Sequence, residues 1–247
     1  MARQMPRGTM TSNRTEIAVY DLDRTLTDTG SWAHFIRFWL RTQAPWRVLL
    51  LPLVALGGLA YALGLMSRGG IKSWSHRWLI GGRVRAADMA AVAAAFADTF
   101  VAAHALEPAR AALAADAAAG RRLLIASASH GFYVRAIAAR LGVADVVATE
   151  AVRDGDWLLN RLDGDNCYGA AKRVAVEQWL GRQAQGDAVV HFTSDHHSDQ
   201  PCFDLALERG GRVLCVNPSN ELAAIAAVRG WPVAQWGRIK GSLFERA

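Results

Sequence analysis

Two aspartates that directly follow a short apolar run are the residues of this chain best placed to do chemistry. Residues 17–20 are typical of a buried strand that is too short to be a helix, and Asp21 and Asp23 follow it one residue apart. In an open α/β sheet, ligands bind at the carboxyl ends of the strands, so we expect both carboxylates at a ligand site. Two like charges this close repel each other, and the usual remedies are a bound cation or a raised pKa on one of them.

Ser127 and Lys172 lie at two further places that suit an anion. Residues 122–126 are typical of a strand, and Ser127 follows them just ahead of a predicted helix that runs to Arg140. Free backbone N–H groups at a helix N-terminus point at an anion, so a small hydroxyl there suits phosphate. Lys172 follows Gly169 at the start of another predicted helix. A helix-capping serine and a solvated surface lysine are the alternatives for these two residues.

Another buried-type strand, residues 188–193, ends in acids. Asp195 and Asp199 follow it, with His196 and His197 between them. The two histidines would suit a transition metal, but adjacent histidines point apart on most backbones, and the flanking acids explain the site without them. The role of both histidines stays open.

In this order, the segments around Asp21, Ser127, Lys172 and Asp195 resemble motifs I to IV of the haloacid dehalogenase (HAD) superfamily, in its phosphoserine phosphatase-like form. The resemblance implies that Asp21 is a nucleophile that forms an aspartyl-phosphate, and that Asp23 is the general acid and base. It also implies Mg²⁺ as the cofactor, because hard oxygen ligands completed by water and substrate phosphate suit that ion.

The same resemblance distributes the remaining roles. The implied substrate-binding residues are Thr25, Ser127, Ala128 and Lys172, and the implied metal ligands are Asp21, Asp23, Asp195 and Asp199. Lys172 is also implied in catalysis, because a fixed cation beside the nucleophile neutralises charge during phosphoryl transfer. The chain departs from the family pattern at two places: Arg24 replaces a glycine, and Ser194 and His196 flank Asp195 in place of glycine and serine.

The stretch between Asp28 and Asp88 differs in composition from the rest of the chain. It contains eight arginines or lysines and no acidic residue, whereas the whole chain of 247 residues has a net charge of +6. Residues 48–67 within it hold no charge, and this run is long enough to raise a membrane span. Five of the nine tryptophans flank the run: Trp32, Trp39, Trp46, Trp74 and Trp78. Tryptophan and basic residues beside an apolar run are typical of a bilayer interface.

A single membrane crossing is excluded if the motifs build one site, because the chain must then return to the side it left. Pro52 and the pair Gly57-Gly58 favour two short helices, which a re-entrant hairpin or an in-plane helix would accommodate. We therefore expect the segment 46–67 to contact an anionic membrane surface. The alternative is a soluble helical cap whose apolar face packs on the core or on a partner.

The order of elements predicts an α/β fold with a doubly wound parallel sheet, because strands that end in acids alternate with helices. By the resemblance, this is a HAD-type Rossmann-like core with an α-helical C1 cap inserted between the first and second core strands. We expect a flexible tail at 1–16, the core at 17–33 and 107–247, and the cap at 34–106. Three cysteines that lie far apart indicate a reducing compartment without structural disulfides.

The function implied by the resemblance is that of a Mg²⁺-dependent phosphomonoesterase. The basic, apolar cap is most similar in character to that of the phosphatidylglycerophosphatase C type, which implies a phosphate monoester on a lipid as substrate. We therefore expect a peripheral or monotopic protein on the cytoplasmic side of the inner membrane, with no nucleic-acid partner; the oligomeric state is not indicated. Two alternatives stay open: a soluble, cytoplasmic phosphatase for a small metabolite such as phosphoserine, and a non-catalytic, membrane-associated binding protein.

Overall fold

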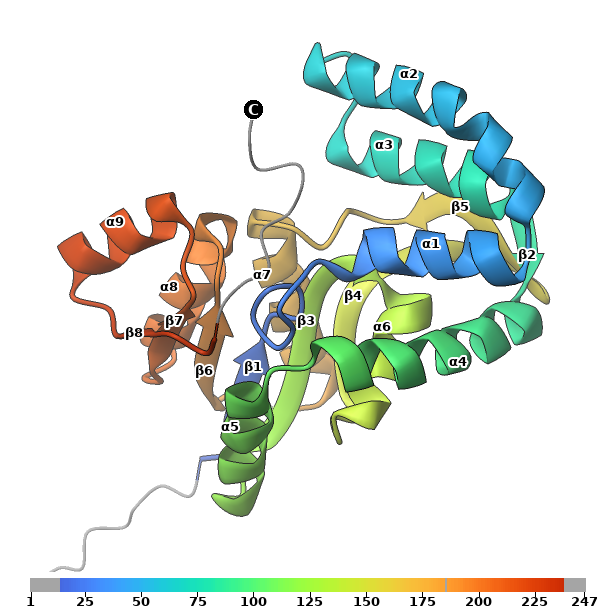
Figure 1. The fold of residues 1–247 in the computed structure, drawn as a ribbon. Coiled ribbons are helices and arrows are strands. Elements are labelled where there is room, and N and C mark those ends of the chain that lie inside the picture. Colours follow the sequence, from blue (N-terminus) through green and yellow to red (C-terminus); the bar gives the residue numbers. More distant parts are fainter. Residues whose placement is uncertain (1–13, 185, 238–247) are drawn as a thin grey trace, which may run out of the picture.

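The computed structural model describes residues 14–184 and 186–237 and has a mostly parallel sheet at its centre (Figure 1). Within the described residues the strand order is β2-β5-β4-β3-β1-β6-β7-β8. The strands are β1 (Glu16–Tyr20), β2 (Arg83–Arg85), β3 (Arg122–His130), β4 (Asp145–Asp154), β5 (Trp157–Asp163), β6 (Val189–Ser194), β7 (Val213–Val216) and β8 (Val233–Ala234). The predicted tail at 1–16 lies mainly outside the described residues, and Glu16 already belongs to β1.

The strand pairing confirms the predicted α/β fold. β1 pairs in parallel with β3 on one side and with β6 on the other, and β4, β7 and β8 continue the parallel sheet. At the far edge, β5 pairs antiparallel with both β4 and β2. The carboxyl ends of β1, β3 and β6 therefore meet at one edge of the sheet, where the sequence predicted a ligand site.

Helices cover both faces of the sheet. They are α1 (Ser31–Thr42), α2 (Leu51–Ala62), α3 (Arg68–Ser75), α4 (Ala86–His104), α5 (Glu107–Ala118), α6 (Gly131–Arg140), α7 (Ala170–Arg182), α8 (Gln200–Glu208) and α9 (Asn220–Arg229). The described residues also form three short helical segments: the 3-10 helix η1 (Pro45–Leu50), the π-helix η2 (His76–Ile80) and the 3-10 helix η3 (His197–Asp199). Side chains of α1, α4, α5 and α6 pack in one apolar core, and those of α7, α8 and α9 pack in a second.

The residues of strand β1 pack alternately into the two apolar cores. Successive side chains of a strand point to opposite faces of the sheet. Ala18 and Tyr20 accordingly pack with α4 and α6, whereas Ile17 and Val19 pack with α7 and α8. All four are at most 4% exposed, so the strand is buried on both faces, as expected for a central parallel strand.

The segment between β1 and β3 supplies the helices that lie over one side of the sheet. It contains α1 to α5, so it is an insertion between two neighbouring core strands, as expected. Within it, α4 does not form a separate layer, because its buried residues share the core that α6 and β1 line. The predicted boundary of the cap at 34–106 stays a prediction; α1 begins at Ser31, ahead of it.

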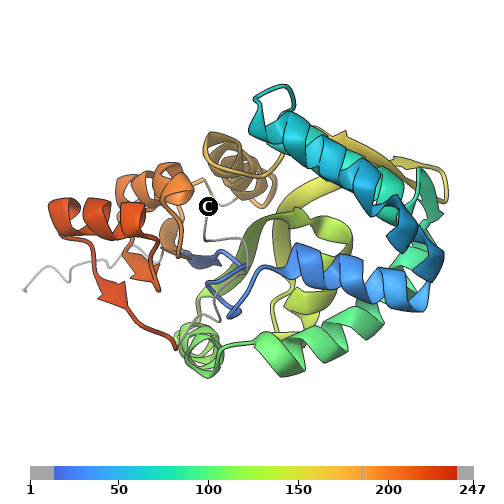
Figure 2. The ribbon, with the colours of Figure 1, turned by 45° about the horizontal axis from the view of Figure 1, so that its top comes forward.

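Helices α2 and α3 form a hairpin at the outer margin of the molecule (Figures 1 and 2). Pro52 lies in the first turn of α2, directly after the 3-10 helix η1, so the run divides into two helices there as expected, whereas Gly57-Gly58 lie inside α2 and do not interrupt it. The two helices pack closely at Gly57, where an added Cβ would come within 2.3 Å of the indole of Trp74 on α3. The Trp74 indole N–H donates to the carbonyl of Leu53 at 2.8 Å, which ties the two helices together.

Two helical segments of the described chain, 45–62 and 86–104, are long and apolar enough to cross a membrane by length and composition alone. The second is packed into the core by the same residues that bury α4. The first has a mean hydropathy of 1.4 and only 6% of its residues are buried. Its exposed apolar side chains include Trp46, Leu49, Leu56 and Leu59. These two neighbouring elements, η1 and α2, therefore present an apolar surface that no described part of the chain covers.

Candidate active site

The sheet register brings Asp21 and Asp195 to neighbouring strand ends. Tyr20 of β1 is opposite Thr193 of β6, and the Asp21 amide continues the ladder by donating to the Thr193 carbonyl at 2.9 Å. Asp195 follows the last residue of β6 directly. Both aspartates are less than 8% exposed, so the two carboxylates lie in a sheltered position at the edge of the sheet.

Thr25 links these two carboxylates. Its hydroxyl oxygen accepts the Asp195 amide at 3.0 Å, and it lies 3.1 Å from a carboxylate oxygen of Asp195. The same hydroxyl is 3.5 Å from Asp21 Oδ2. Asp21 and Asp195 therefore lie beside the same hydroxyl group.

Lys172, at the start of α7, lies between Asp21 and a third acid. Its ammonium group donates to Asp21 Oδ1 at 2.8 Å and to Asp199 Oδ2 at 2.7 Å. Burial alone would lower the pKa of this amine, but the charges of Asp199 and Asp21 outweigh it and hold the pKa well above its usual value. Lys172 is therefore a fixed cation beside the predicted nucleophile.

Asp23 lies on a different side of the site from this ion-paired group. One of its carboxylate oxygens accepts the Ser31 amide at 2.7 Å, at the N-terminus of α1, and the other accepts the Ser129 hydroxyl at 2.6 Å. The positive end of a helix dipole stabilises a carboxylate in such a position. Both oxygens of Asp23 are thus held by α1 and β3, so its predicted part in metal binding stays a prediction.

The end of β3 is irregular at the predicted phosphate seat. Ser127 is buried and accepts the Ser129 amide at 3.1 Å, and the pairing of β3 with β4 shifts between Ser127 and His130. The carbonyl of Ala128 accepts from Lys72 of α3 and, at 2.7 Å, from the hydroxyl of Thr149. The irregular end of β3 after Ser127 is therefore held by a side chain from the inserted segment as well as by the sheet.

Arg24, one of the departures from the family pattern, lies at a backbone position that would suit glycine. Its φ of 65° lies in the left-handed region, which glycine adopts without the steric cost that other residues meet. The glycine expected at this position would therefore suit the backbone, and this chain makes the same turn with an arginine.

The buried acids around Lys172 outnumber the single amine that can offset their charge. Burial raises the pKa of Asp21 to about 7 despite the opposing charge of Lys172. Burial and then the charge of Asp21 raise the pKa of Asp195 well above its usual value. In the described part of the chain, Asp199 Oδ1 is buried and has no hydrogen-bond partner.

This excess of buried carboxylate oxygens fits a hard divalent cation. No group of three or more His, Cys, Asp or Glu side chains in the described residues is arranged to hold a metal. Mg²⁺, however, commonly uses only one or two carboxylates and completes its shell with water and substrate phosphate. Asp21 and Asp195 are the pair that would hold it.

His196 and His197 take no part in this cluster. His196 Nδ1 lies 2.8 Å from the Ser198 hydroxyl and accepts the Ser198 amide at 3.1 Å, so it caps the short helix η3. His197 faces Glu221 at 3.8 Å. The geometry of the described residues therefore offers no support for the transition-metal alternative.

Two contacts of the site were not found by sequence reasoning. The Ser194 hydroxyl donates to Asp199 Oδ2 at 2.7 Å, and the Ser129 hydroxyl holds Asp23. The signal for Ser194 was present, because this serine stands where the family pattern has glycine. Ser129 lies two residues after Ser127, but nothing in the sequence ties it to a residue more than a hundred positions away.

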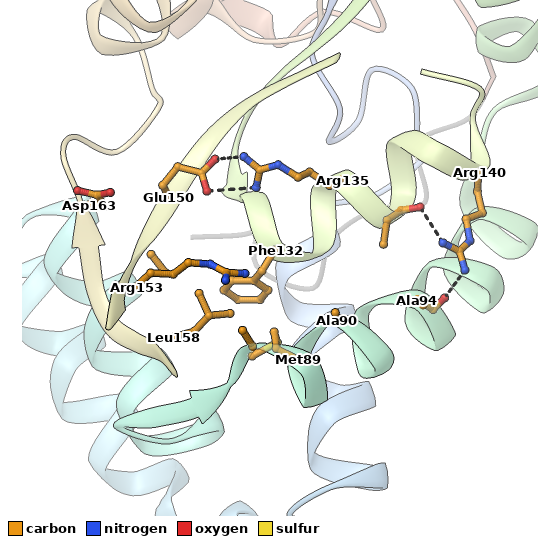
Figure 3. Close-up of a pocket in the computed structure, with 13 residues that line it drawn as sticks. Met89, Ala90, Ala94, Phe132, Arg135, Arg140, Glu150, Arg153, Leu158 and Asp163 are labelled. Carbon is orange, nitrogen blue, oxygen red and sulfur yellow. Dashed lines mark hydrogen bonds and ion pairs between the residues drawn. The ribbon is translucent and has the colours of Figure 1, made fainter. Parts of the chain in front are cut away.

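A hollow near the antiparallel edge of the sheet is not part of this site. It measures about 620 Å³ and lies between α4, α6, β4 and β5 (Figure 3). No predicted site residue lines it, and two of its arginines are already paired: Arg135 with Glu150, and Arg140 with Asp98 just outside the hollow. We therefore assign it no role in the chemistry.

Comparison with known families decides the class of protein. Residues 18–204 match the family model for haloacid dehalogenase-like hydrolases, which covers more than half of the chain. The chain belongs to this family. The HAD membership agrees with the resemblance seen in motifs I to IV, and the matched region runs from β1 to α8.

Relatives and solved structures agree with that membership. A "Probable phosphatase" of Mycobacterium tuberculosis is 32% identical over 130 residues, which are 51% of this chain and 42% of that protein. A histidinol-phosphatase of Neisseria meningitidis is 29% identical over 47% of this chain and 52% of its own length. The chain thus spans about half the length of the curated relatives it matches.

Among solved structures, a protein of unknown function from Bordetella pertussis matches with a TM-score of 0.78 and 24% identity, over 91% of this chain and all of that one. A phospho-aspartyl intermediate analogue of phosphoserine phosphatase matches with a TM-score of 0.58 and 13% identity, over 91% of this chain and 95% of the other. At these identities the likeness shows the shared HAD fold.

Proposed function

We propose that this HAD hydrolase is a Mg²⁺-dependent phosphomonoesterase that works through an aspartyl-phosphate on Asp21. The observation that carries the proposal is the position of Lys172, which bridges Asp21 and Asp199 while Asp21 shares the Thr25 hydroxyl with Asp195. A carboxylate beside a fixed cation suits attack on phosphorus, because the cation offsets the charge on the phosphoryl oxygens.

Two displacements follow from this arrangement. In the first, a carboxylate oxygen of Asp21 bonds to phosphorus, the ester P–O bond breaks, and Asp23 gives a proton to the leaving alcohol. In the second, Asp23 takes a proton from water as the water oxygen bonds to phosphorus, and the Asp21–phosphorus bond breaks to release phosphate. Lys172 and Ser127 bind the phosphoryl oxygens throughout. Bound Mg²⁺ would supply further neutralisation of their charge.

Replacing the nucleophile tests the proposal. We expect Asp21→Asn to abolish phosphate release from a phosphate monoester in the presence of Mg²⁺, because the neutral amide cannot form the acyl phosphate. Phosphate release from the wild-type chain is measured alongside. Equal rates for the two proteins would refute the assignment of Asp21.

For the substrate, we propose a phosphate monoester on a lipid, reached from an anionic membrane surface. The support is the exposed apolar face of η1 and α2, with Leu56 and Leu59 more than half exposed, together with basic residues beside it. Arg47, for example, lies 4.8 Å from the ring of Trp46, at the start of the apolar run. A basic and aromatic border is what an in-plane helix needs at anionic headgroups. The proposed location is the cytoplasmic side of the inner membrane, peripheral or monotopic.

Flotation with vesicles tests the membrane part separately. We expect the wild-type chain to float with vesicles of phosphatidylethanolamine and phosphatidylglycerol, and the double variant Leu56→Asp and Leu59→Asp to float much less. Val228→Asp is a matched control, because Val228 is 90% exposed on α9, away from α2. A wild-type chain that stays at the bottom of the gradient would contradict the membrane proposal and leave the phosphatase proposal standing.

A soluble phosphatase for a small metabolite is the second candidate. Its support is the relative named histidinol-phosphatase, together with a hollow of only about 340 Å³ that Ala128, near the end of β3, helps to line. Such an enzyme would share every catalytic residue with the first candidate. Phosphate release from soluble esters without vesicles, combined with no flotation, would favour it.

A further inference from the structure

The hollow beside Asp23 is bordered by the inserted helices on one side and by the end of β3 on the other. It measures about 340 Å³ and is lined by residues of α1, α2 and α3, by Ala128 and by the loop before α7. Its wall includes Trp32 and Ala128. The residues next to these in the sequence, Ser31 and Ser129, both hold Asp23: Ser31 through its amide and Ser129 through its hydroxyl. The hollow therefore lies on the side of the site where the proposed general acid is found.

Lys72 of α3 reaches into the wall of this hollow. Its ammonium group donates to the Ala128 carbonyl and to the Asn166 side chain, so one of its three N–H bonds is left for another acceptor. Within the described part of the chain no carboxylate lies within ion-pair distance of it. Burial lowers its pKa to about 8, and the charge of Asp23 acts against that shift.

A second cation lines the same hollow. The guanidinium of Arg68 lies 4.2 Å from the centre of the Tyr168 ring, which holds it at the wall. The residues that the structure describes contain no acid that forms an ion pair with it. Two cations thus line one small hollow, and no acid among the described residues forms an ion pair with either of them, which is an arrangement that a bound anion would stabilise.

The rest of the wall is apolar. Ile71 and Trp32 line it, and so does Tyr61 of α2, the helix whose outer face carries the exposed leucines. A short carbon chain would find apolar contacts here, and Tyr61 marks the direction in which a longer substrate would leave the hollow towards α2. Pockets of this volume are at the small end of the range seen for small-molecule ligands.

Resting on the proposed function, we infer that this hollow binds the leaving alcohol and that Lys72 and Arg68 bind a second anionic group on that alcohol. The leaving oxygen takes its proton from Asp23, so the alcohol must lie on the Asp23 side. The phosphoryl group that is transferred is already matched by Lys172 on the Asp21 side, so Lys72 and Arg68 are free to recognise another anion. The substrate class is a phosphate monoester of a short alcohol that also carries a phosphodiester, a second phosphate or a carboxylate.

Matched substrates test the inference without vesicles. We expect kcat/KM for a glycerol bisphosphate to exceed that for glycerol monophosphate by about tenfold or more, because one charge-assisted hydrogen bond gives a factor of that order. Phosphoglycerate tests a carboxylate in place of the second phosphate, and phosphatidylglycerophosphate in detergent micelles tests a phosphodiester that carries a lipid. Preference for the soluble or for the lipid ester identifies the source of the second anion.

Three variants locate the recognition. The quantity compared is the ratio of kcat/KM for glycerol bisphosphate to that for glycerol monophosphate. We expect Lys72→Gln and Arg68→Gln each to lower this ratio by roughly tenfold, since each removes one cation from the hollow. Arg182→Gln removes the same charge from an exposed turn at the end of α7 and should leave the ratio unchanged.

The outcomes separate this inference from the proposed function. Equal rates for the two glycerol esters in the wild-type chain would overturn the inference. So would a loss in Lys72→Gln that is the same for both esters, because Lys72 would then only position Ala128, Asn166 or Asp23. If no ester releases phosphate with Mg²⁺, the proposed function itself fails, and the inference fails with it.

Discussion

Removing the cation at the centre of the site should separate its structural role from its chemical role. Lys172 is 2% exposed and forms ion pairs of 2.8 Å with Asp21 and 2.7 Å with Asp199. Lys172→Met keeps the length of the side chain but leaves two buried carboxylates without their partner. Breaking a buried ion pair from one side costs about 3–5 kcal/mol, so we expect a loss of this size in the free energy of unfolding at neutral pH.

A second substitution then distinguishes the two roles. Adding Asp199→Asn to Lys172→Met removes one of the unpaired charges, so part of the lost stability should return, on the order of 1 kcal/mol or more. Phosphate release should stay at least about a hundredfold below that of the wild-type chain, because the fixed ammonium group that offsets the charge on the phosphoryl oxygens is gone. Asp199→Asn alone is the control for the loss of the acid.

The assay is urea unfolding in the presence of EDTA, followed by phosphate release with Mg²⁺ at saturating substrate. EDTA is needed because a divalent cation bound to Asp21 and Asp195 would mask part of the stability loss. A Lys172→Met chain as stable as the wild type would refute the reasoning on stability. A double variant with wild-type phosphate release would refute the chemical role of Lys172.

Three further predictions concern the hairpin, a buried histidine and Thr25. Gly57→Val should lower the free energy of unfolding by about 1–3 kcal/mol in urea titrations, because its Cβ would overlap the Trp74 indole of α3. Gly58→Ala should not destabilise the chain, because no atom lies near its Cβ. Equal effects of the two substitutions would contradict the packing account. Burial lowers the pKa of His76 from 6.5 to about 4, so the unfolded chain binds more protons between these pH values, and stability should fall as the pH drops through that window. His76→Phe should flatten this pH dependence, and an unchanged slope would assign it to other groups. Thr25→Val should raise the Mg²⁺ concentration needed for half-maximal phosphate release, whereas Thr99→Val on α4 should leave that concentration unchanged. If the two variants need the same Mg²⁺ concentration, Thr25 does not hold Asp21 and Asp195 in position.

The convergence of the strand ends could be predicted because it depends on local patterns and one general rule. Residues 17–20 and 188–193 are apolar runs of strand length, and parallel strands bring the residues that follow them to one edge. Asp21 and Asp195 consequently lie together, although 173 residues separate them. The start of α7 could be predicted in the same way, and Lys172 follows from it by position alone.

The contacts made by the inserted segment could not be predicted in this way. Lys72 reaches Asn166, which is 94 positions away, and no motif contains either residue. Their meeting depends on how the α2–α3 hairpin packs on β5, which is a matter of side-chain shape rather than of pattern. The same holds for Gly57, because its close approach to Trp74 depends on how α2 and α3 pack and not on any local pattern.

The most direct measurement of the central claim is a search for phosphate covalently bound to Asp21. Asp23→Asn should slow hydrolysis of the aspartyl-phosphate more than its formation when the leaving group is a good one such as p-nitrophenol, so the intermediate should accumulate. After acid quenching, peptide mass spectrometry should find phosphate on the carboxylate of Asp21 and on no other residue. A variant that still releases phosphate while its Asp21 peptide stays unmodified under single-turnover conditions would contradict the account.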